Sequence, residues 1–167
     1  MASARTAGTG TDNFVEQIAV ILEADGMARV AGRIFGLLLV SAEPRSLDEL
    51  AEKLGVSKAS ISINVRLLEE KGVVERIGRQ GDRRDYYRTA EDMFERMLEQ
   101  RMAKVRRLQQ SIEFACKACL RENHVVRSRL ENLDLAYNHL LDVTQRALDE
   151  WRVRRNKRGT THTARSR

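Results

Sequence analysis

Five arginines surround a glycine-containing turn in the stretch from residue 70 to residue 92, EKGVVERIGRQGDRRDYYRTAED. They are Arg76, Arg79, Arg83, Arg84 and Arg88. Between the first and the last of them the only acids are Asp82 and Asp85, so five positive charges less two leave a local surplus of three. Guanidinium groups are natural partners of phosphate, and an arginine at a protruding tip can enter a narrow DNA minor groove. The pattern predicts a hairpin that binds phosphate; the alternative is a hairpin whose charges are only solvated.

Within this hairpin we expect Asp82 to hold one arginine through a charged hydrogen bond, which leaves a second arginine free to reach DNA. Gly78 and Gly81 allow the turn to bend. The residues of the hairpin that we assign to DNA contact are Arg79, Asp82, Arg83 and Arg84.

A short predicted helix before the hairpin has small and polar side chains on one side. On a helical wheel that starts at Ser57, the apolar residues Ile61, Val65 and Leu68 share the side that packs inward. The opposite side could enter the DNA major groove, where hydroxyl groups and an arginine reach phosphates or base edges and an isoleucine meets a thymine methyl group. The residues on that side are Ala59, Ser62, Ile63 and Arg66.

The first turn of the same helix is better placed for phosphates, because the N-terminal end of a helix is positive. It contains Ser57, Lys58 and Ser60. The alternative is that Lys58 and Arg66 are solvated charges and that Ile63 packs beneath another helix. Glu69 and Glu70 would repel phosphate, so only the first half of the helix can approach DNA.

These two surfaces need a helix-turn-helix and a hairpin to position them. Pro44 interrupts the chain, and Ser46 and Glu49 then form an S-x-x-E capping box for a helix that ends at Gly55. Ser57 opens the next helix two residues later. The runs VVERI and DYYRT that flank the turn GRQGDRR are β-prone. Helix, helix and hairpin together predict a winged helix-turn-helix.

Two further helices are expected before this motif, one from Asp12 or Asn13 to about Asp25 and one over about residues 28–41. Gly32 and Gly36 are four residues apart in the second, a spacing that predicts close helix contact rather than ligand binding. The residues before the first helix are small and polar, and we expect them to be disordered.

Two long amphipathic helices are predicted after the hairpin, over residues 91 to about 121 and from His124 or Val125 to Trp151. The first carries Phe94, Leu98, Met102, Val105, Leu108, Ile112, Ala115 and Cys119 at steps of three or four, and the second carries Val126, Leu130, Leu133, Tyr137, Leu140, Thr144, Leu148 and Trp151. The apolar surface of these stripes is larger than a domain of this size can readily cover by itself. This favours a homodimer, in which a second copy buries the same surface. The alternative is a helical hairpin folded back within one chain.

The predicted fold class is therefore mainly α with a small β-hairpin, a winged helix-turn-helix with long N- and C-terminal dimerisation helices. The predicted domains are a disordered N-terminal tail (1–12), the DNA-binding domain with its N-terminal helices (13–90), a helical dimerisation region (91–151) and a basic disordered tail (152–167). The tail could add sequence-independent phosphate contacts or bind any other acidic partner.

The net charge of +6 does not by itself identify a binding face. Seven of the thirty basic residues lie in 152–167, where there is no acid, so residues 1–151 carry 23 bases against 24 acids. The longest apolar run, IFGLLLV, is far shorter than the roughly 20 residues of a membrane span. No membrane association and a cytoplasmic location are expected, and the two cysteines fit a reducing compartment.

No enzyme is predicted. Neither His139 nor His162 has a Cys, Ser or carboxylate partner pattern, and no glycine-rich phosphate loop or cofactor motif is present. Cys116, Cys119 and His124 give only three candidate zinc ligands, which is too few for a closed structural site. We interpret both cysteines as small buried hydrophobic residues, with redox sensing as the alternative.

The segment from Gly26 to Thr89 resembles the GbsR group of MarR-type transcriptional regulators. Its most specific parts are the helix of Gly26–Gly36, the run SLDELAEKLGVSKASIS and the motif GDRRDYY. The resemblance covers roughly residues 14 to 115. The last helix and the basic tail have no counterpart that we can match.

The resemblance implies a homodimeric repressor with the SKASIS helix in the major groove of double-stranded DNA and the GDRR wing on the minor groove. It also implies that Asp82 and Arg84 form a functional pair. The name-giving member responds to choline, so a small-molecule effector is implied, although its identity does not transfer. A quaternary ammonium would require an aromatic cage, and only one of Tyr86 and Tyr87 could join it, because the two side chains point to opposite sides of a strand. The remaining alternative is a winged-helix module that binds another protein without sequence-specific DNA binding.

Overall fold

The structure is a computed structural model of the 167-residue chain and describes residues 4–118 and 124–163. It divides into two compact units, residues 1–97 and 98–167. The elements in chain order are α1 (Ala4–Ala24), α2 (Arg29–Leu39), β1 (Arg45–Ser46), α3 (Leu47–Leu54), α4 (Lys58–Glu70), β2 (Val74–Arg79), β3 (Asp82–Thr89), α5 (Met93–Ala118) and α6 (His124–Thr163). The predicted fold class, mainly helical with a small β-hairpin in a winged helix-turn-helix, is confirmed.

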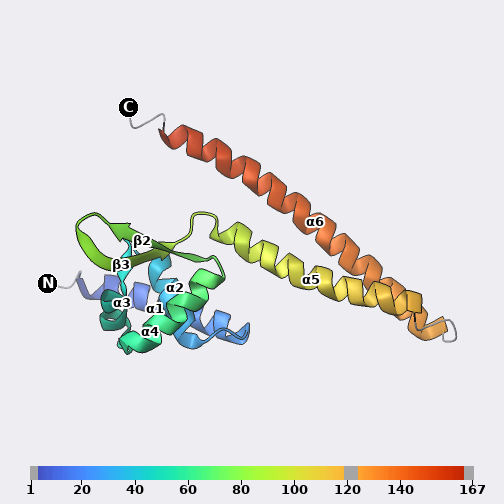
Figure 1. Cartoon of the computed structure of the whole chain (residues 1–167), viewed down its shortest axis with the longest axis horizontal. Coiled ribbons are helices and arrows are strands. Elements are labelled where there is room, and N and C mark those ends of the chain that lie inside the picture. Colours follow the sequence, from blue (N-terminus) through green and yellow to red (C-terminus); the bar gives the residue numbers. More distant parts are fainter. Residues whose placement is uncertain (1–3, 119–123, 164–167) are drawn as a thin grey trace. The chain divides into compact units, whose positions relative to one another are not determined.

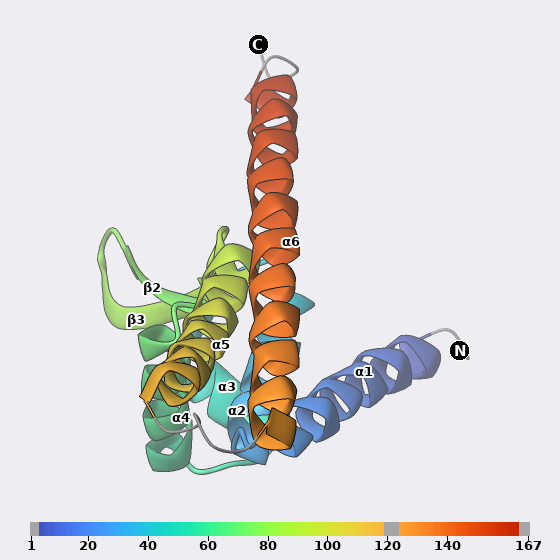
Figure 2. The same cartoon turned by 90° about the vertical axis from the view of Figure 1, so that its right-hand side faces the viewer.

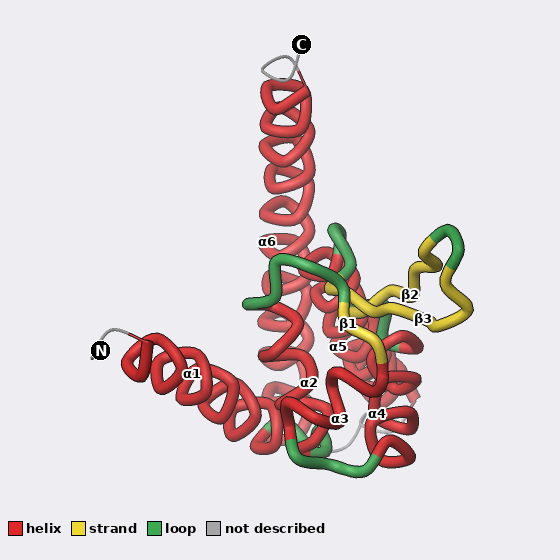
Figure 3. Tube along the Cα trace, turned by 90° about the vertical axis from the view of Figure 1, so that its left-hand side faces the viewer, coloured by secondary structure: helices red, strands yellow, loops and turns green. Residues whose placement is uncertain are grey.

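The core of the first unit gathers around α2, which is buried along most of its length (Figure 3). Helix α1 crosses α2 at the two predicted glycines. A Cβ atom on Gly32 would lie 2.7 Å from the Ala19 Cα, and one on Gly36 would lie 3.2 Å from the Val15 Cα. Both positions therefore bring two helix backbones together, as predicted.

The helix-turn-helix starts at the predicted capping box. The Ser46 hydroxyl accepts a hydrogen bond from the Glu49 amide at 3.3 Å, and the Glu49 carboxylate accepts one from the Ser46 amide at 2.7 Å. This second bond is the main reason why the pKa of Glu49 is lowered. Gly55 ends α3 in the left-handed conformation, with φ of 64°, which an L side chain rarely adopts.

A three-stranded antiparallel sheet in the order β1-β3-β2 completes the first unit (Figure 3). Sequence patterns predicted only the hairpin of β2 and β3. The additional strand β1 is two residues long and pairs Arg45 with Tyr87 and Ser46 with Tyr86. It joins the start of α3 directly to the second strand of the wing.

The second unit contains α6 and most of α5, which run antiparallel beside each other (Figure 1, Figure 2). The Gln109 side chain donates to Asp134 at 2.9 Å, and Arg152 pairs with Glu99. The predicted apolar stripes are only partly covered. Met102, Ile112 and Leu148 are buried, whereas the exposed members include Phe94, Leu108, Leu133, Leu140 and Trp151.

Two helix ends differ from the predicted ones. Helix α1 begins at Ala4, before the predicted cap at Asp12 or Asn13, and α6 continues to Thr163, through most of the segment predicted to be a disordered tail. Arginine and lysine are good helix formers and dominate residues 152–158, so this part of the chain can propagate a helix that already exists. The glycines and threonines of residues 4–11 have low helix propensity, so composition does not explain the earlier start of α1. Asp12 pairs with Lys53 at 4.0 Å instead of capping α1, and Arg154 pairs with Glu150 at 3.3 Å along α6. No helix in the described part of the chain is long and apolar enough to cross a membrane.

Candidate nucleic-acid interface

Helix α4 has the two sides that its sequence predicts. Ile61, Val65 and Leu68 are each 1% exposed or less and pack into the core of the first unit. On the opposite side, Ala59 and Arg66 are exposed and Ser62 is half-buried. Ile63 is 69% exposed, so it does not pack beneath another helix. This side of α4 presents a shallow surface with one apolar and one cationic side chain.

The first turn of α4 is held by local bonds. The Ser57 hydroxyl oxygen accepts a hydrogen bond from the Ser60 amide at 3.3 Å, which leaves the hydroxyl proton available to another acceptor. The Lys58 ammonium lies 2.7 Å from the Asp48 carboxylate of α3. Lys58 therefore already has an anionic partner, with which a phosphate would have to compete.

The wing is the hairpin of β2 and β3, and its turn lies between Arg79 and Asp82. The register shifts between Gly78 and Arg79, and Gly81 adopts a positive φ of 83°. Three of the five arginines are paired with acids of the hairpin, Arg76 with Asp85 at 3.3 Å, Arg88 with Glu75 at 2.6 Å and Arg84 with Asp82 at 2.7 Å. Arg79 and Arg83 lie on either side of the turn, and the Arg79 guanidinium lies 3.7 Å from the Glu43 carboxylate outside the hairpin.

Asp82 holds one arginine of the hairpin, as its sequence predicts, and this arginine is Arg84, the partner that the family resemblance implies. The Arg84 Nη2 lies 2.7 Å from one Asp82 carboxylate oxygen, and its Nε lies 3.1 Å from both oxygens. The Arg84 backbone amide also donates to Asp82 at 2.9 Å. These bonds lower the pKa of Asp82 well below its ordinary range and raise that of Arg84. The pair uses Nε and Nη2 of the guanidinium and leaves Nη1 for another acceptor.

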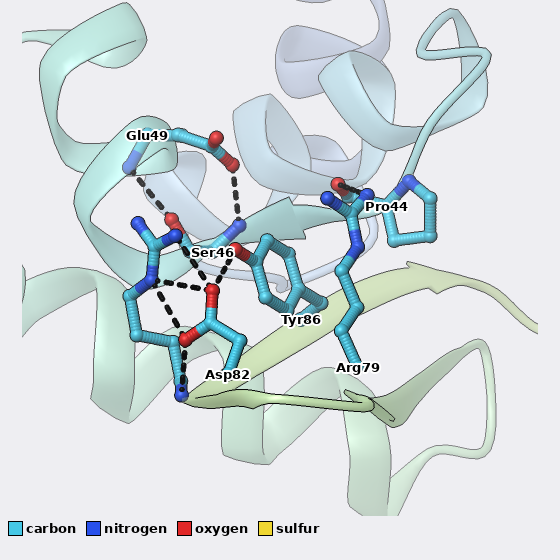
Figure 4. A network of polar contacts seen from close by, with 7 residues as sticks. Pro44, Ser46, Glu49, Arg79, Asp82 and Tyr86 are labelled. Atoms are coloured by element: carbon cyan, nitrogen blue, oxygen red, sulfur yellow. Dashed lines mark hydrogen bonds and ion pairs between the residues drawn. The ribbon is translucent and has the colours of Figure 1, made fainter.

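Tyr86 is a member of this cluster that the sequence analysis did not include (Figure 4). Its side chain is 2% exposed, and its hydroxyl donates to the Asp82 carboxylate at 2.8 Å. The Arg79 guanidinium lies over the Tyr86 ring, 4.1 Å from the ring centre, and donates to the Pro44 carbonyl at 3.4 Å. Residues 82, 84 and 86 alternate along one strand and so share one of its faces, a signal that could have identified Tyr86.

The two tyrosines of the wing have different surroundings. Tyr87 packs into the core of the first unit, whereas the Tyr86 ring has a guanidinium on its face. A quaternary ammonium at Tyr86 would have to displace Arg79.

Within the described residues, the cysteine and histidine side chains do not come together in one site. Cys116 is half-buried on a cavity of about 400 Å³ between α5 and α6, together with Glu113, Lys117 and Glu131. Cys119 lies outside the described residues. Within residues 4–118 and 124–163, no group of three His, Cys, Asp or Glu side chains could hold a metal ion.

Comparison with known proteins assigns the segment that contains the helix-turn-helix and the wing to a family. Residues 25–85 match the model of the MarR family. The chain is 43% identical over 82 residues to the HTH-type transcriptional regulator MmpR5 of Mycobacterium tuberculosis. The matched segment is 48% of this chain and 50% of that protein. It is 30% identical over 83 residues to the HTH-type transcriptional repressor GbsR of Bacillus subtilis. That matched segment is 50% of this chain and 46% of GbsR. The chain thus spans about half the length of the curated relatives it matches.

A solved structure extends the match beyond the wing. A crystal structure described as a transcriptional regulator superposes with a TM-score of 0.70 at 31% identity, over 85% of this chain and 97% of that chain. The curated relatives are named as regulators, not as enzymes. The lower identity to GbsR leaves the narrower GbsR group unconfirmed. The chain belongs to the MarR family of winged-helix transcriptional regulators.

Proposed function

We propose that this chain is a sequence-specific DNA-binding repressor that acts as a homodimer in the cytoplasm and is controlled by a small effector. The observation that supports this most is the combination of an exposed, small-residue side of α4 with a wing that carries a fixed arginine, both within the first compact unit. Together they match the shapes of two adjacent DNA grooves.

In this proposal α4 enters the major groove. Ala59 and Ser62 are small enough to let the helix backbone approach the bases, and Ile63 contacts a thymine methyl group. Its exposed fraction of 69% favours this role over a structural one. Arg66 donates to a guanine or a phosphate, and Ser57, Lys58 and Ser60 contact phosphates at the start of the helix.

The wing contacts the adjacent minor groove. Arg84 is oriented by Asp82 and presents Nη1 to the DNA, and Arg79 and Arg83 add positive charge beside it. Narrow minor grooves have an enhanced negative potential that attracts arginine. This arrangement would favour A·T-rich sequence beside each half-site.

The dimer is supported by an exposed apolar stripe along one side of α6. Its members recur at steps of three and four and are Leu133, Ala136, Leu140, Val143, Ala147 and Trp151. Exposed Val20 and Ile21 on α1 form a second apolar patch. A contiguous apolar surface of this kind is typical of an interface, and a twofold dimer would read two half-sites one helical turn apart.

The motifs GDRRDYY and SLDELAEKLGVSKASIS support membership of the GbsR-like group and hence effector control. An effector would have to bind the DNA-free and DNA-bound conformations with different affinities in order to release the operator. We assign no chemical class to this effector.

The test is selection from random duplex DNA with the purified chain at about 150 mM salt, where non-specific contacts are weakened. An enriched near-palindrome, with a half-site spacing of one helical turn, is expected. The variant Arg66→Ala should relax the preference at one position of each half-site. Salt-sensitive binding without any enriched sequence would contradict the proposal and favour a protein-interaction module.

A further inference from the structure

We propose that Tyr86 is a positioning residue that fixes two of the wing arginines, Arg79 and Arg84, in the geometry in which they meet DNA. This inference rests on the proposed DNA-binding function and adds a buried residue that does not itself touch the DNA. Its ring holds Arg79 by stacking, and its hydroxyl holds Arg84 through Asp82 (Figure 4).

The hydroxyl acts on Arg84 through a shared acceptor. The Asp82 carboxylate accepts from the Tyr86 hydroxyl at 2.8 Å and from the Arg84 Nη2 at 2.7 Å, both on the same oxygen. A carboxylate bonded only to Arg84 could rotate together with that long, exposed side chain. A bond from a residue that is 2% exposed prevents this rotation, because the tyrosine ring cannot move without disturbing its packing.

The ring acts on Arg79 directly. The Arg79 guanidinium lies 4.1 Å from the ring centre, and Arg84 lies 5.4 Å from the same centre. Cations within about 6 Å of an aromatic face are attracted to it. One aromatic ring therefore contacts both guanidinium groups.

The backbone around Tyr86 makes it a suitable anchor. In the sheet, Tyr86 pairs with Ser46 of β1 on one side and with Ile77 of β2 on the other. The Ser46 side chain caps α3, which packs against α4. The wing arginines are thereby linked to the helix-turn-helix through consecutive bonded residues, so the distance between wing and α4 is set by rigid elements rather than by the flexible turn.

The experiment compares Tyr86→Phe with Tyr87→Phe in the full chain. Each removes one hydroxyl group from neighbouring positions of β3, but only Tyr86 bonds to Asp82. The probe is a duplex enriched by the selection described above, and the readouts are the dissociation constant and the Arg84 Nε–H signal in NMR spectra of the DNA-free protein. Tyr86→Phe should weaken binding about three- to ten-fold, in the range of one typical hydrogen bond, and should shift and broaden the Arg84 signal. Tyr87→Phe should change neither readout.

A double-mutant cycle separates positioning from a general effect on the fold. In an Arg84→Ala background, Tyr86→Phe should cause little further loss, because the residue through which its hydroxyl acts is gone. An undiminished loss in that background, or wild-type affinity of Tyr86→Phe, would overturn the inference while the DNA-binding proposal stands. If the wild-type chain binds no duplex, the DNA-binding proposal fails and this role fails with it.

Discussion

The Lys58 ammonium at the start of α4 lies 2.7 Å from the Asp48 carboxylate in the first turn of α3. A cation that is positioned to meet phosphate is thus neutralised within the DNA-free chain. In the proposed complex, phosphate competes with Asp48 for Lys58, and this competition lowers the affinity that the helix could otherwise provide.

We predict that Asp48→Asn strengthens DNA binding about two- to five-fold, because an exposed ion pair contributes up to about 1 kcal/mol and its loss leaves Lys58 to the phosphates. The salt dependence of binding should also become steeper, since one more cation is neutralised by DNA. The measurement is a titration of duplex DNA at several salt concentrations. Asp12→Asn is the matched control: it removes the same charge from an ion pair with Lys53, outside α4. Equal gains for both variants would show that the effect is one of net charge alone.

Close contact between α1 and α2 at Gly32 makes a second prediction. An added Cβ would lie 2.7 Å from the Ala19 Cα, which is backbone and cannot turn aside. We expect Gly32→Ala to lower the free energy of unfolding by about 1–3 kcal/mol through overpacking. Chemical denaturation measures this change.

Gly10→Ala provides the control for that substitution. Gly10 also lies in a helix, and an added Cβ there would have nothing within 4 Å. This variant should raise stability by up to about 1 kcal/mol, as expected from helix propensity. If Gly32→Ala were also stabilising, the two helices would not be in the close contact described.

The Asp82–Arg84 pair gives a prediction about pH. The pKa of Asp82 is lowered mainly by the hydrogen bonds from Arg84, with a further contribution from the Tyr86 hydroxyl. A carboxyl group whose pKa is lower in the folded state stabilises the fold above its unfolded pKa, near 4, and this contribution is lost as the pH falls through the lower folded value. NMR titration of the Asp82 carboxyl carbon should therefore show it still ionised at about pH 4, where an ordinary aspartate is half protonated.

Arg84→Ala should return the Asp82 pKa towards its ordinary value, and Tyr86→Phe should raise it by less, because Arg84 is the larger cause. Indistinguishable titrations of Asp82 in the wild type and in Arg84→Ala would mean that the pair does not form in solution.

Local chemistry explains which parts of the fold could be predicted from the sequence. The capping box of Ser46 and Glu49, the stop at Gly55 and the buried side of α4 depend on residues within a few positions of each other. Strand β1 was missed because two residues form a strand only when β3, far along the chain, supplies the partner. The end of α6 was misjudged because a run of arginines was interpreted as disorder, although arginine also favours helix. The start of α1 was misjudged too, and the composition of residues 4–11 does not explain it.

The contacts of the candidate site also divide into those set by residues close in sequence and those set by tertiary packing. The family resemblance implied the Asp82–Arg84 pair, which needs only neighbours in one strand. The stacking of Arg79 on Tyr86 and its bond to Pro44 depend on tertiary packing, so no local pattern indicates them. Whether Ile63 is buried could not be decided from the helical wheel, because the answer depends on which helices lie next to α4.

The apolar stripe on α6 makes the last prediction. Leu140 is 48% exposed and lies in the middle of the stripe, so a charge there would be buried in the proposed interface. We expect Leu140→Glu to shift the chain from dimer to monomer in analytical ultracentrifugation and to weaken operator binding, because a monomer cannot hold both half-sites at once. Leu135→Glu is the control, since Leu135 is 70% exposed on the same helix and is not a member of the stripe. It should leave both properties unchanged. Loss of the dimer in both variants would indicate a general disturbance of α6, and a persistent dimer in Leu140→Glu would place the interface elsewhere.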